Sequence, residues 1–235
     1  MSALRSGFWL LVAVLTPAAL LGCVTGPVKQ VVEPTNVIRA DRALPEAALL
    51  DVGVQVFETA AITAAEASEQ NTDPKILEAE ARFIPFHLKK TLQETGQWGA
   101  VRVIPARAEE VDVSVSGKLL ESNGEKLRVE VKVVDATGRE WFHNEYTAQA
   151  TEKSYEVLDK KQDRDPYQDL YNQVANDMLD YRQRLNAKDV SAIRQVAQLK
   201  FARNVAPYYF GSHLVQDRDG ILRVSRLPAE NDPMF

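Results

Sequence analysis

The sequence predicts an α+β domain with a mostly antiparallel sheet, in the order strand, helix, strand and meander, covered on one face by helices. Apolar and polar residues alternate over 111–119 and again over 127–133, the period of half-buried strands. Asp-Pro pairs at 73–74 and 165–166 each precede an apolar stripe with helical spacing. We expect the helix after Asp165 to cover the apolar face of the sheet.

The domain is predicted to begin with a strand over 52–56, where valine alternates with glycine and glutamine. Residues 59–70 fit either a helix or a loop. The next helix is expected to start at Asp73 and to end at Gly96. Pro85 lies inside it and lacks a backbone N–H group, so a kink or a break is expected there.

Valine repeats over 99–104 predict a further strand, and a three-stranded meander is expected over 110–148. Opposed residues on paired strands share a face, so the loop length sets which apolar residues meet. A three-residue loop at 122–124 places Leu119 opposite Leu127, and the next turn repeats this geometry at 136–138.

The C-terminal part is predicted to add a helix over 189–205 that ends before Pro207, followed by a hairpin within 208–227. The helical pattern after Asp165 and the one over 189–205 are compatible with two separate helices or with one bent helix. We therefore expect a single domain over 48–235 with a helical and hairpin extension from about 189.

The N-terminus has the layout of a secretory signal over 1–22, with Arg5 before an apolar stretch from Phe8 to Leu21 and the small residue Gly22 at its end. Leu20-Leu21-Gly22-Cys23 resembles the lipobox of bacterial lipoproteins. That resemblance implies cleavage before Cys23 and acylation of its thiol. Residues 23–47 are non-periodic and contain several prolines, so we expect them to form an extended tether.

The lipobox implies a location in the bacterial envelope. Cys23 is the only cysteine, so a lipidated chain has no disulfide. Val24 follows it in place of the acidic residue that resembles an inner-membrane retention signal, which favours the outer membrane, with the domain facing the periplasm. The alternatives are an ordinary signal peptide or a short N-terminal span that happens to contain a cysteine.

The charge balance limits the choice of partners. The chain carries 33 acidic and 28 basic residues, and this negative balance argues against nucleic acid and against electrostatic binding to anionic lipid. The expected membrane contact is therefore made by the acyl chains on Cys23.

Residue patterns typical of catalysis do not occur in the sequence: it has no nucleophile elbow, no H-E-x-x-H and no phosphate-binding glycine loop. The three histidines, His87, His143 and His213, are far apart in sequence, so we expect no metal and no cofactor. Asp217 and Asp219 before Gly220 resemble the start of a calcium loop, but a hairpin turn explains them better.

Tyr208, Tyr209 and Phe210 form the aromatic run that is hardest to bury on both faces. A contiguous apolar group at the surface is typical of a protein contact site. We expect these three residues to contact a partner.

The order of elements resembles that of a group of bacterial envelope proteins. Four segments carry the resemblance: Phe-His-Leu-Lys-Lys-Thr-Leu at 86–92, Trp-Gly-Ala-Val-Arg-Val at 98–103, Val-Ser-Val-Ser-Gly-Lys-Leu at 113–119 and Val-Lys-Val-Val-Asp at 131–135. The group includes the Tol translocation protein N-terminal domain, the curli export lipoprotein and the lipoprotein activators of cell-wall synthases. The resemblance implies non-enzymatic docking to envelope machinery.

Three functions follow in order of preference. The first is a non-catalytic lipoprotein that assembles, stabilises or activates an envelope complex with other envelope proteins. The second is an auxiliary lipoprotein of a transport system for lipid or another apolar ligand, which requires an apolar cavity between the sheet and the helix after Asp165. The third is a tethered hydrolase, which requires a histidine clustered with carboxylates in a cleft.

Overall fold

The computed structural model describes residues 26–32, 34–69, 71–105, 110–150, 165–229 and 231. Its helices are η1 (Glu46–Ala48), α1 (Ala64–Glu69), α2 (Pro74–Thr95), α4 (Gln168–Gln183), α5 (Ala187–Val205) and α6 (Pro207–Phe210). Its strands are β1 (Val28–Gln30), β2 (Val52–Gln55), β3 (Glu58–Thr59), β4 (Val101–Ile104), β5 (Val113–Ser122), β6 (Lys126–Asp135), β7 (Glu140–Gln149), β8 (Leu214–Gln216) and β9 (Leu222–Val224).

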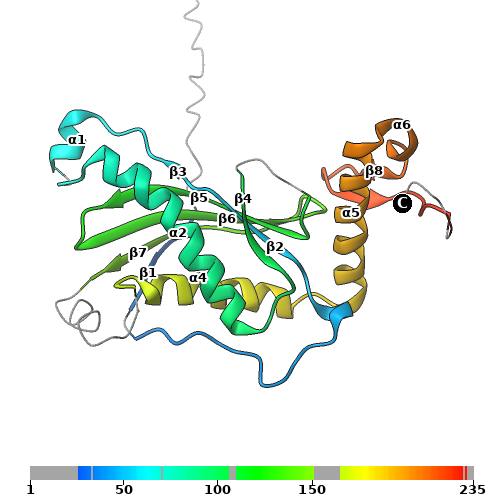
Figure 1. Cartoon of the computed structure of the whole chain (residues 1–235), viewed down its shortest axis with the longest axis horizontal. Coiled ribbons are helices and arrows are strands. Elements are labelled where there is room, and N and C mark those ends of the chain that lie inside the picture. The colour runs from blue at the N-terminus through cyan, green and yellow to red at the C-terminus, as the bar shows by residue number, and fades with distance from the viewer. Residues whose placement is uncertain are drawn as a thin grey trace, which may run out of the picture.

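The main sheet has the order β1-β7-β6-β5-β2-β4, with β3 also paired to β5 (Figure 1). The α+β class is confirmed, but the expectation of a mostly antiparallel sheet is wrong. Only the β5–β6 and β6–β7 pairs are antiparallel, whereas β1–β7, β2–β4, β2–β5 and β3–β5 are parallel. The crossover through α2 allows β2 to lie parallel to both β4 and β5.

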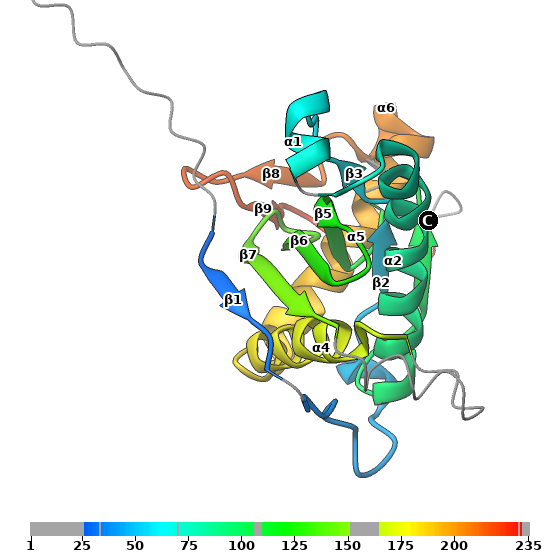
Figure 2. The same cartoon turned by 90° about the vertical axis from the view of Figure 1, so that its left-hand side faces the viewer.

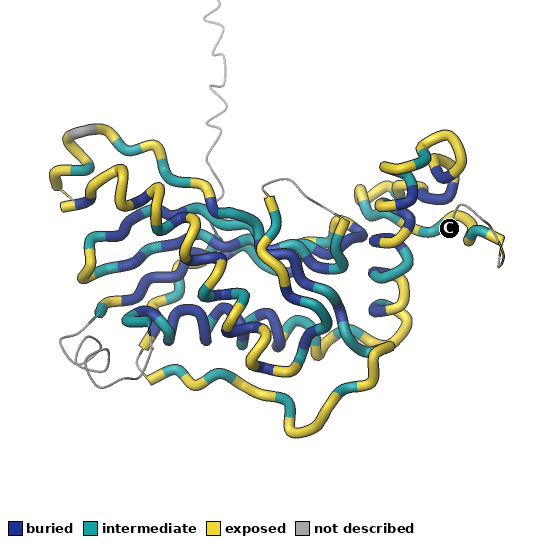
Figure 3. Tube along the Cα trace, in the orientation of Figure 1, coloured by how far each residue is buried: buried dark blue, intermediate teal, exposed yellow. Residues whose placement is uncertain are grey.

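Helices α2 and α4 pack on the same face of the sheet, and the buried residues lie between them and the strands (Figures 2 and 3). On β6, buried valines alternate with half-buried charged residues that point to the opposite face. Met178, Leu170 and Tyr146 are at most 1% exposed, so side chains fill the space between sheet and α4. This packing counts against the apolar cavity that the transport hypothesis requires there.

Helix α2 begins and ends where the sequence predicts. The Asp73 carboxylate accepts a hydrogen bond from the N–H of Lys75, and Gly96 ends the helix in the left-handed conformation with a φ of 65°. The helix is continuous through Pro85, so the expected break does not occur. Within 59–70, which fitted either a helix or a loop, residues 64–69 form helix α1 and residues 60–63 form a loop.

The meander is confirmed, but its predicted register is wrong by two residues. Leu119 lies opposite Val129 because a bulge follows Leu119 and the last pair before the loop is Ser122 with Leu127. The Asn123 side chain accepts hydrogen bonds from the N–H groups of Glu125 and Lys126, and this stabilises the turn between β5 and β6.

A second bulge lies in β7 next to the turn at 136–138, which forms as predicted with Gly138 at a φ of 89°. The bulge reverses the side-chain alternation in β7, so that Trp141 and Tyr146 both reach the core. The Trp141 ring stacks on Tyr181 of α4 with centroids 4.9 Å apart. Its indole N–H donates to the buried Asp135 carboxylate at 3.0 Å.

The expectation of an extended tether is wrong for the described residues of 28–40, because they are bound to the domain. Strand β1 extends the sheet beside β7. Beyond it, the N–H groups of Thr35 and Ile38 donate to the side chains of Asp169 and Asn176 on α4, both at 2.9 Å. The amides of Asn172 and Asn176 donate back to main-chain carbonyls of the segment. We call residues 28–50 the strap.

The C-terminal part contains two separate helices, α4 and α5, since Asn186 caps α5 with a full capping box. The predicted hairpin forms as β8–β9, although 207–210 are helical. The Asp217 carboxylate accepts hydrogen bonds from the N–H groups of Asp219 and Ile221 and from the Arg223 side chain, which confirms a turn. No described helix has the length and apolar character needed to cross a membrane.

Candidate functional site

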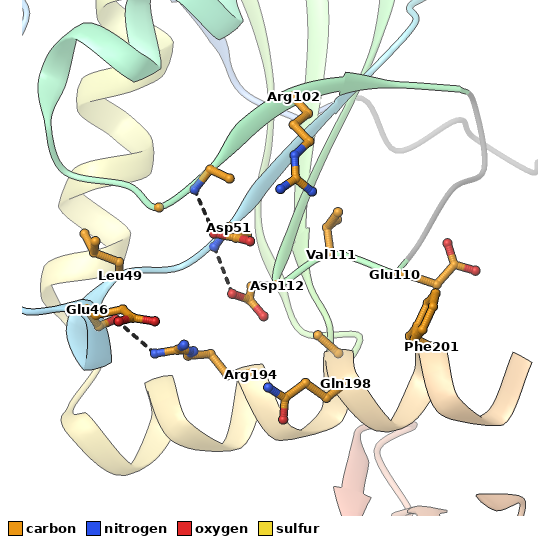
Figure 4. Close-up of a pocket in the computed structure, with 13 residues that line it drawn as sticks. Glu46, Leu49, Asp51, Arg102, Glu110, Val111, Asp112, Arg194, Gln198 and Phe201 are labelled. Carbon is orange, nitrogen blue, oxygen red and sulfur yellow. Dashed lines mark hydrogen bonds between the residues drawn. The ribbon is translucent and has the colours of Figure 1, made fainter. Parts of the chain in front are cut away.

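A polar cleft of about 450 Å³ lies between helix α5 and the starts of strands β2, β4 and β5 (Figure 4). Its lining residues come from η1, these strands and the residues before them, and α5. They are Glu46, Leu49, Asp51, Gly99, Ala100, Arg102, Glu110, Val111, Asp112, Arg194, Ala197, Gln198 and Phe201.

Two carboxylates lie side by side in the cleft because β2 and β5 run parallel and in register. Asp51 precedes β2 and Asp112 precedes β5. The N–H of Asp51 donates to the Asp112 carboxylate at 2.8 Å, and the Asp51 carboxylate accepts the N–H of Ala100 at 2.7 Å. The pair therefore joins the starts of three neighbouring strands through main-chain hydrogen bonds.

The close approach of the two carboxylates affects Asp112. Burial raises the pKa of Asp112, and the negative charge of Asp51 raises it further. The N–H bond from Asp51 and the positive charge of Arg194 act in the opposite direction. Gly99 makes room for this arrangement, because a Cβ there would lie 2.3 Å from an Asp51 carboxylate oxygen.

The two arginines of the cleft differ in how they are held. The guanidinium of Arg194 donates to the main-chain oxygen of Glu46 at 2.9 Å and so joins α5 to the strap. Arg102 is exposed and extends from β4 toward the cleft (Figure 4). The lining set includes no Ser, Thr, Cys, His or Lys. Its polar side chains are carboxylates, guanidinium groups and one amide, which can bind a charged or polar group.

Sequence reasoning missed this cleft, although a signal was present. Asp-Val-Gly-Val at 51–54 and Asp-Val-Ser-Val at 112–115 are the same pattern. Their meeting depends on a parallel pair of strands, which the predicted antiparallel sheet does not contain.

Gly22 and Cys23 lie outside the described residues, so the structure carries no information on them. Of the expected aromatic contact residues, Tyr208 and Tyr209 are 93% and 58% exposed. Phe210 is only 1% exposed and packs beside His213, so its assignment to a partner contact is wrong. The short helix α6 turns Phe210 into the core while it leaves the two tyrosines outside.

The histidines lie in separate places. His87 stacks on Tyr171 with centroids 5.6 Å apart, and its Nε2 lies 3.6 Å from the Asp165 carboxylate. Burial and the Asp165 charge raise the pKa of Tyr171, so this phenol stays protonated.

His143 Nε2 lies 2.9 Å from Glu130 in a separate cavity of about 280 Å³ on the charged face of the sheet. Ser116 lines the same cavity, but β6 lies between its strand and that of His143. Two strand spacings amount to about 9.5 Å, too far for a serine–histidine hydrogen bond without convergence of the side chains. Among the described residues, no group of three potential metal ligands is assembled.

Comparisons with known proteins give no family. No family model matches the chain, and no curated protein matches it. Solved structures with some similarity include the hypothetical protein CT253 from Chlamydia trachomatis, at 12% identity and a TM-score of 0.37, covering 57% of this chain and 98% of that one.

Two further similar structures come from other bacteria. Protein XCC0632 of Xanthomonas campestris, from family DUF330, has 10% identity and a TM-score of 0.31, with 65% and 92% of the two chains covered. A PelC dodecamer of Paraburkholderia phytofirmans has 19% identity and a TM-score of 0.26, with 42% and 69% covered. At these TM-scores the similarities carry no argument about this chain.

Proposed function

We propose that this protein is a lipid-anchored lipoprotein of the outer membrane that faces the periplasm and acts without catalysis in the assembly, stabilisation or activation of an envelope complex. The observation that carries the proposal is Leu20-Leu21-Gly22-Cys23 at the end of a signal-like apolar segment, with the only cysteine of the chain in the lipobox position.

The strap supports a short attachment. Only residues 24–27 separate Cys23 from the start of β1, a reach of about 17 Å at full extension. An acylated Cys23 would therefore hold the domain close to the bilayer rather than on a long tether. The partner would then have to lie near the membrane as well.

The proposed protein contact is the exposed apolar group at the end of α5 and on α6, namely Phe201, Val205, Tyr208 and Tyr209. These side chains are between 58% and 93% exposed. Tyrosine is enriched at protein interfaces because it offers a large apolar ring with a polar tip. His143 and Glu130 lie together in a cavity, as the hydrolase hypothesis requires, but the position of Ser116 two strands away leaves the pair without a serine nucleophile.

The test of the anchor is mass spectrometry of the protein isolated from its native envelope. We expect a chain that begins at Cys23 and carries fatty acyl groups. The Cys23→Ser variant is expected to lose the lipid and to leave the membrane fraction. An unmodified thiol or an intact Met1 would overturn the proposal.

The test of docking is photo-crosslinking in cells from a reactive residue at Tyr209, with the same residue at Ile38 as control. Ile38 is also exposed, at 53%, but belongs to the strap. We expect the residue at position 209 to crosslink reproducibly to one envelope protein, and the residue at position 38 to give no such product. Equal products from both positions would contradict the assigned surface.

A further inference from the structure

Strand β4 leaves one edge of the main sheet open. It is the last strand in the order β1-β7-β6-β5-β2-β4, and among the described residues it pairs only with β2. The carbonyls of Ala100 and Ile104 accept hydrogen bonds from β2. In a parallel ladder the main-chain groups of the intervening Val101 and Val103 point away from that partner.

A contact with α2 shows that the Val101 carbonyl points away from β2. The Gln93 side-chain amide of α2 donates to the Val101 carbonyl at 3.4 Å, on the side away from β2. Val103 lies two residues further along the same edge and is 36% exposed. Its N–H and C=O groups therefore face outward from the sheet, in the position where an added strand would pair.

A groove of about 440 Å³ lies along this edge between α2 and β4. It is lined by Phe86, Lys89, Gln93, Ala100, Val101, Arg102 and Val103. Phe86 is 54% exposed, and Phe83 one turn earlier on α2 is 63% exposed. Apolar side chains of this size would be covered by an alternate side chain of an extended peptide.

The charges of the groove point to the chemistry of the occupant. Its lining has two cations, Lys89 and Arg102, and no carboxylate, although the chain as a whole is acidic. Lys89 Nζ lies 5.3 Å from the centre of the Phe86 ring, so the cation and the apolar site adjoin. Arg102 lies between Val101 and Val103 and so projects to the other face of the strand.

We propose that the β4 edge binds an extended, acidic and apolar peptide segment of an envelope partner, which adds as a strand beside Val103. Its apolar side chains cover Phe86 and Val103 on one face of the added strand, where Lys89 lies at the margin, and its acidic side chains face Arg102 on the other. This inference rests on the proposed docking function and adds the site and the kind of segment bound. It is separate from the tyrosine surface on α6.

The experiment measures fluorescence polarisation of a labelled octapeptide of alternating Val and Glu with the full lipidated chain in detergent. We expect saturable binding below about 1 mM, and binding at least about tenfold weaker for the peptide with Lys in place of Glu. A peptide N-methylated along one edge should not bind, because it cannot pair with the strand. Hydrogen exchange at the Val103 amide should slow when the Val-Glu peptide is bound.

Val103→Pro removes the outward N–H but leaves the Arg102 and Ile104 groups that pair with β2, and it should abolish binding. Val103→Thr keeps the N–H and is the matched control, expected to bind within about threefold of the wild type. Phe86→Ser is a second variant, at an exposed position of α2. We expect this variant to keep the α2 helix and the unfolding midpoint of the wild type. It should weaken binding by about tenfold.

Three results would overturn the inference. They are no binding of the Val-Glu peptide, equal binding of the Lys peptide, or a Val103→Pro variant that folds and still binds. A shift from dimer to monomer on Val103→Pro would instead assign the edge to a second copy of this chain. Acylation of Cys23 and crosslinking from Tyr209 are measured separately, so failure here is distinct from failure of the proposed function.

Discussion

Lys29 of the strap and Asp177 of α4 are joined by an ion pair of 2.7 Å, although 148 positions separate them in the sequence. The same carboxylate oxygen accepts the hydroxyl of the fully buried Tyr146 at 2.6 Å. Burial and the Asp177 charge raise the pKa of Tyr146, so the phenol remains a donor. One carboxylate thus joins β1, β7 and α4.

Asp177→Ala is expected to lower the free energy of unfolding by about 1–3 kcal/mol, because the buried Tyr146 hydroxyl loses its acceptor. Urea unfolding measures this change. Hydrogen exchange over residues 28–40 should also become faster, since Lys29 loses its counter-charge and the strap is released more readily.

The control for Asp177 is Asp180→Ala on the same helix. Asp180 pairs with Arg184 one turn away, and both side chains are about two-thirds exposed. Its loss should cost less than about 0.5 kcal/mol. Equal effects of the two substitutions would contradict the role assigned to Asp177.

Asp112→Asn is expected to reduce the pH dependence of stability. The pKa of Asp112 is raised in the folded state. At pH values between the ordinary and the raised pKa, the folded state therefore binds more protons than the unfolded chain. The free energy of unfolding therefore falls as the pH rises through this range. The Asn oxygen can still accept the N–H of Asp51 without a charge, so the variant should lose less stability between about pH 4 and pH 7.

Asp217→Asn tests the opposite sign by the same series of urea unfolding curves. The hydrogen bond from Arg223 and the N–H donors of its turn lower the pKa of Asp217. Its contribution to stability is present above the ordinary Asp pKa and is lost as the pH falls through the lowered value. If both variants shift the pH profile in one direction, the assignment of Asp112 is wrong.

Phe210→Ala and Tyr208→Ser should separate core from surface in the aromatic run. Phe210 is buried, and its truncation is expected to cost about 3–5 kcal/mol. Tyr208 is exposed, and its substitution should change the free energy of unfolding by less than about 0.5 kcal/mol. Loss of the crosslinked partner in the folded Tyr208→Ser variant would support the contact surface.

Gly99→Ala is expected to destabilise the cleft by about 1.5–3 kcal/mol. The new Cβ would force the Asp51 carboxylate away from the N–H of Ala100, and hydrogen bonds to charged groups are worth this amount. In an Asp51→Ala background the same substitution should cost much less, because the clash is gone. Additive costs in the double variant would rule out this explanation.

The parts that the sequence predicted well depend on local signals. Asp73 and Gly96 fix the ends of α2 because capping involves residues within a few positions of the helix end. The turn before Gly138 and the strands around it follow from alternation and turn chemistry. These features need no knowledge of distant segments.

The parts that were missed depend on distant partners. Strand β1 has three residues and no alternation to reveal it, and its position is fixed by Asp177 and by side chains of α4. The Asp51–Asp112 pair requires strands separated by a crossover. The bulge after Leu119 shifts the register through one unpaired residue, which a count of loop lengths cannot detect.

The short strand β1 has a consequence for self-association. It occupies the outer side of β7, whose ten-residue length would otherwise offer a long template for another chain. The three residues of β1 offer little in its place. A strand that joined β4 would therefore complete the sheet without giving rise to an open-ended fibril, because residues 28–30 of the same chain already occupy the opposite edge.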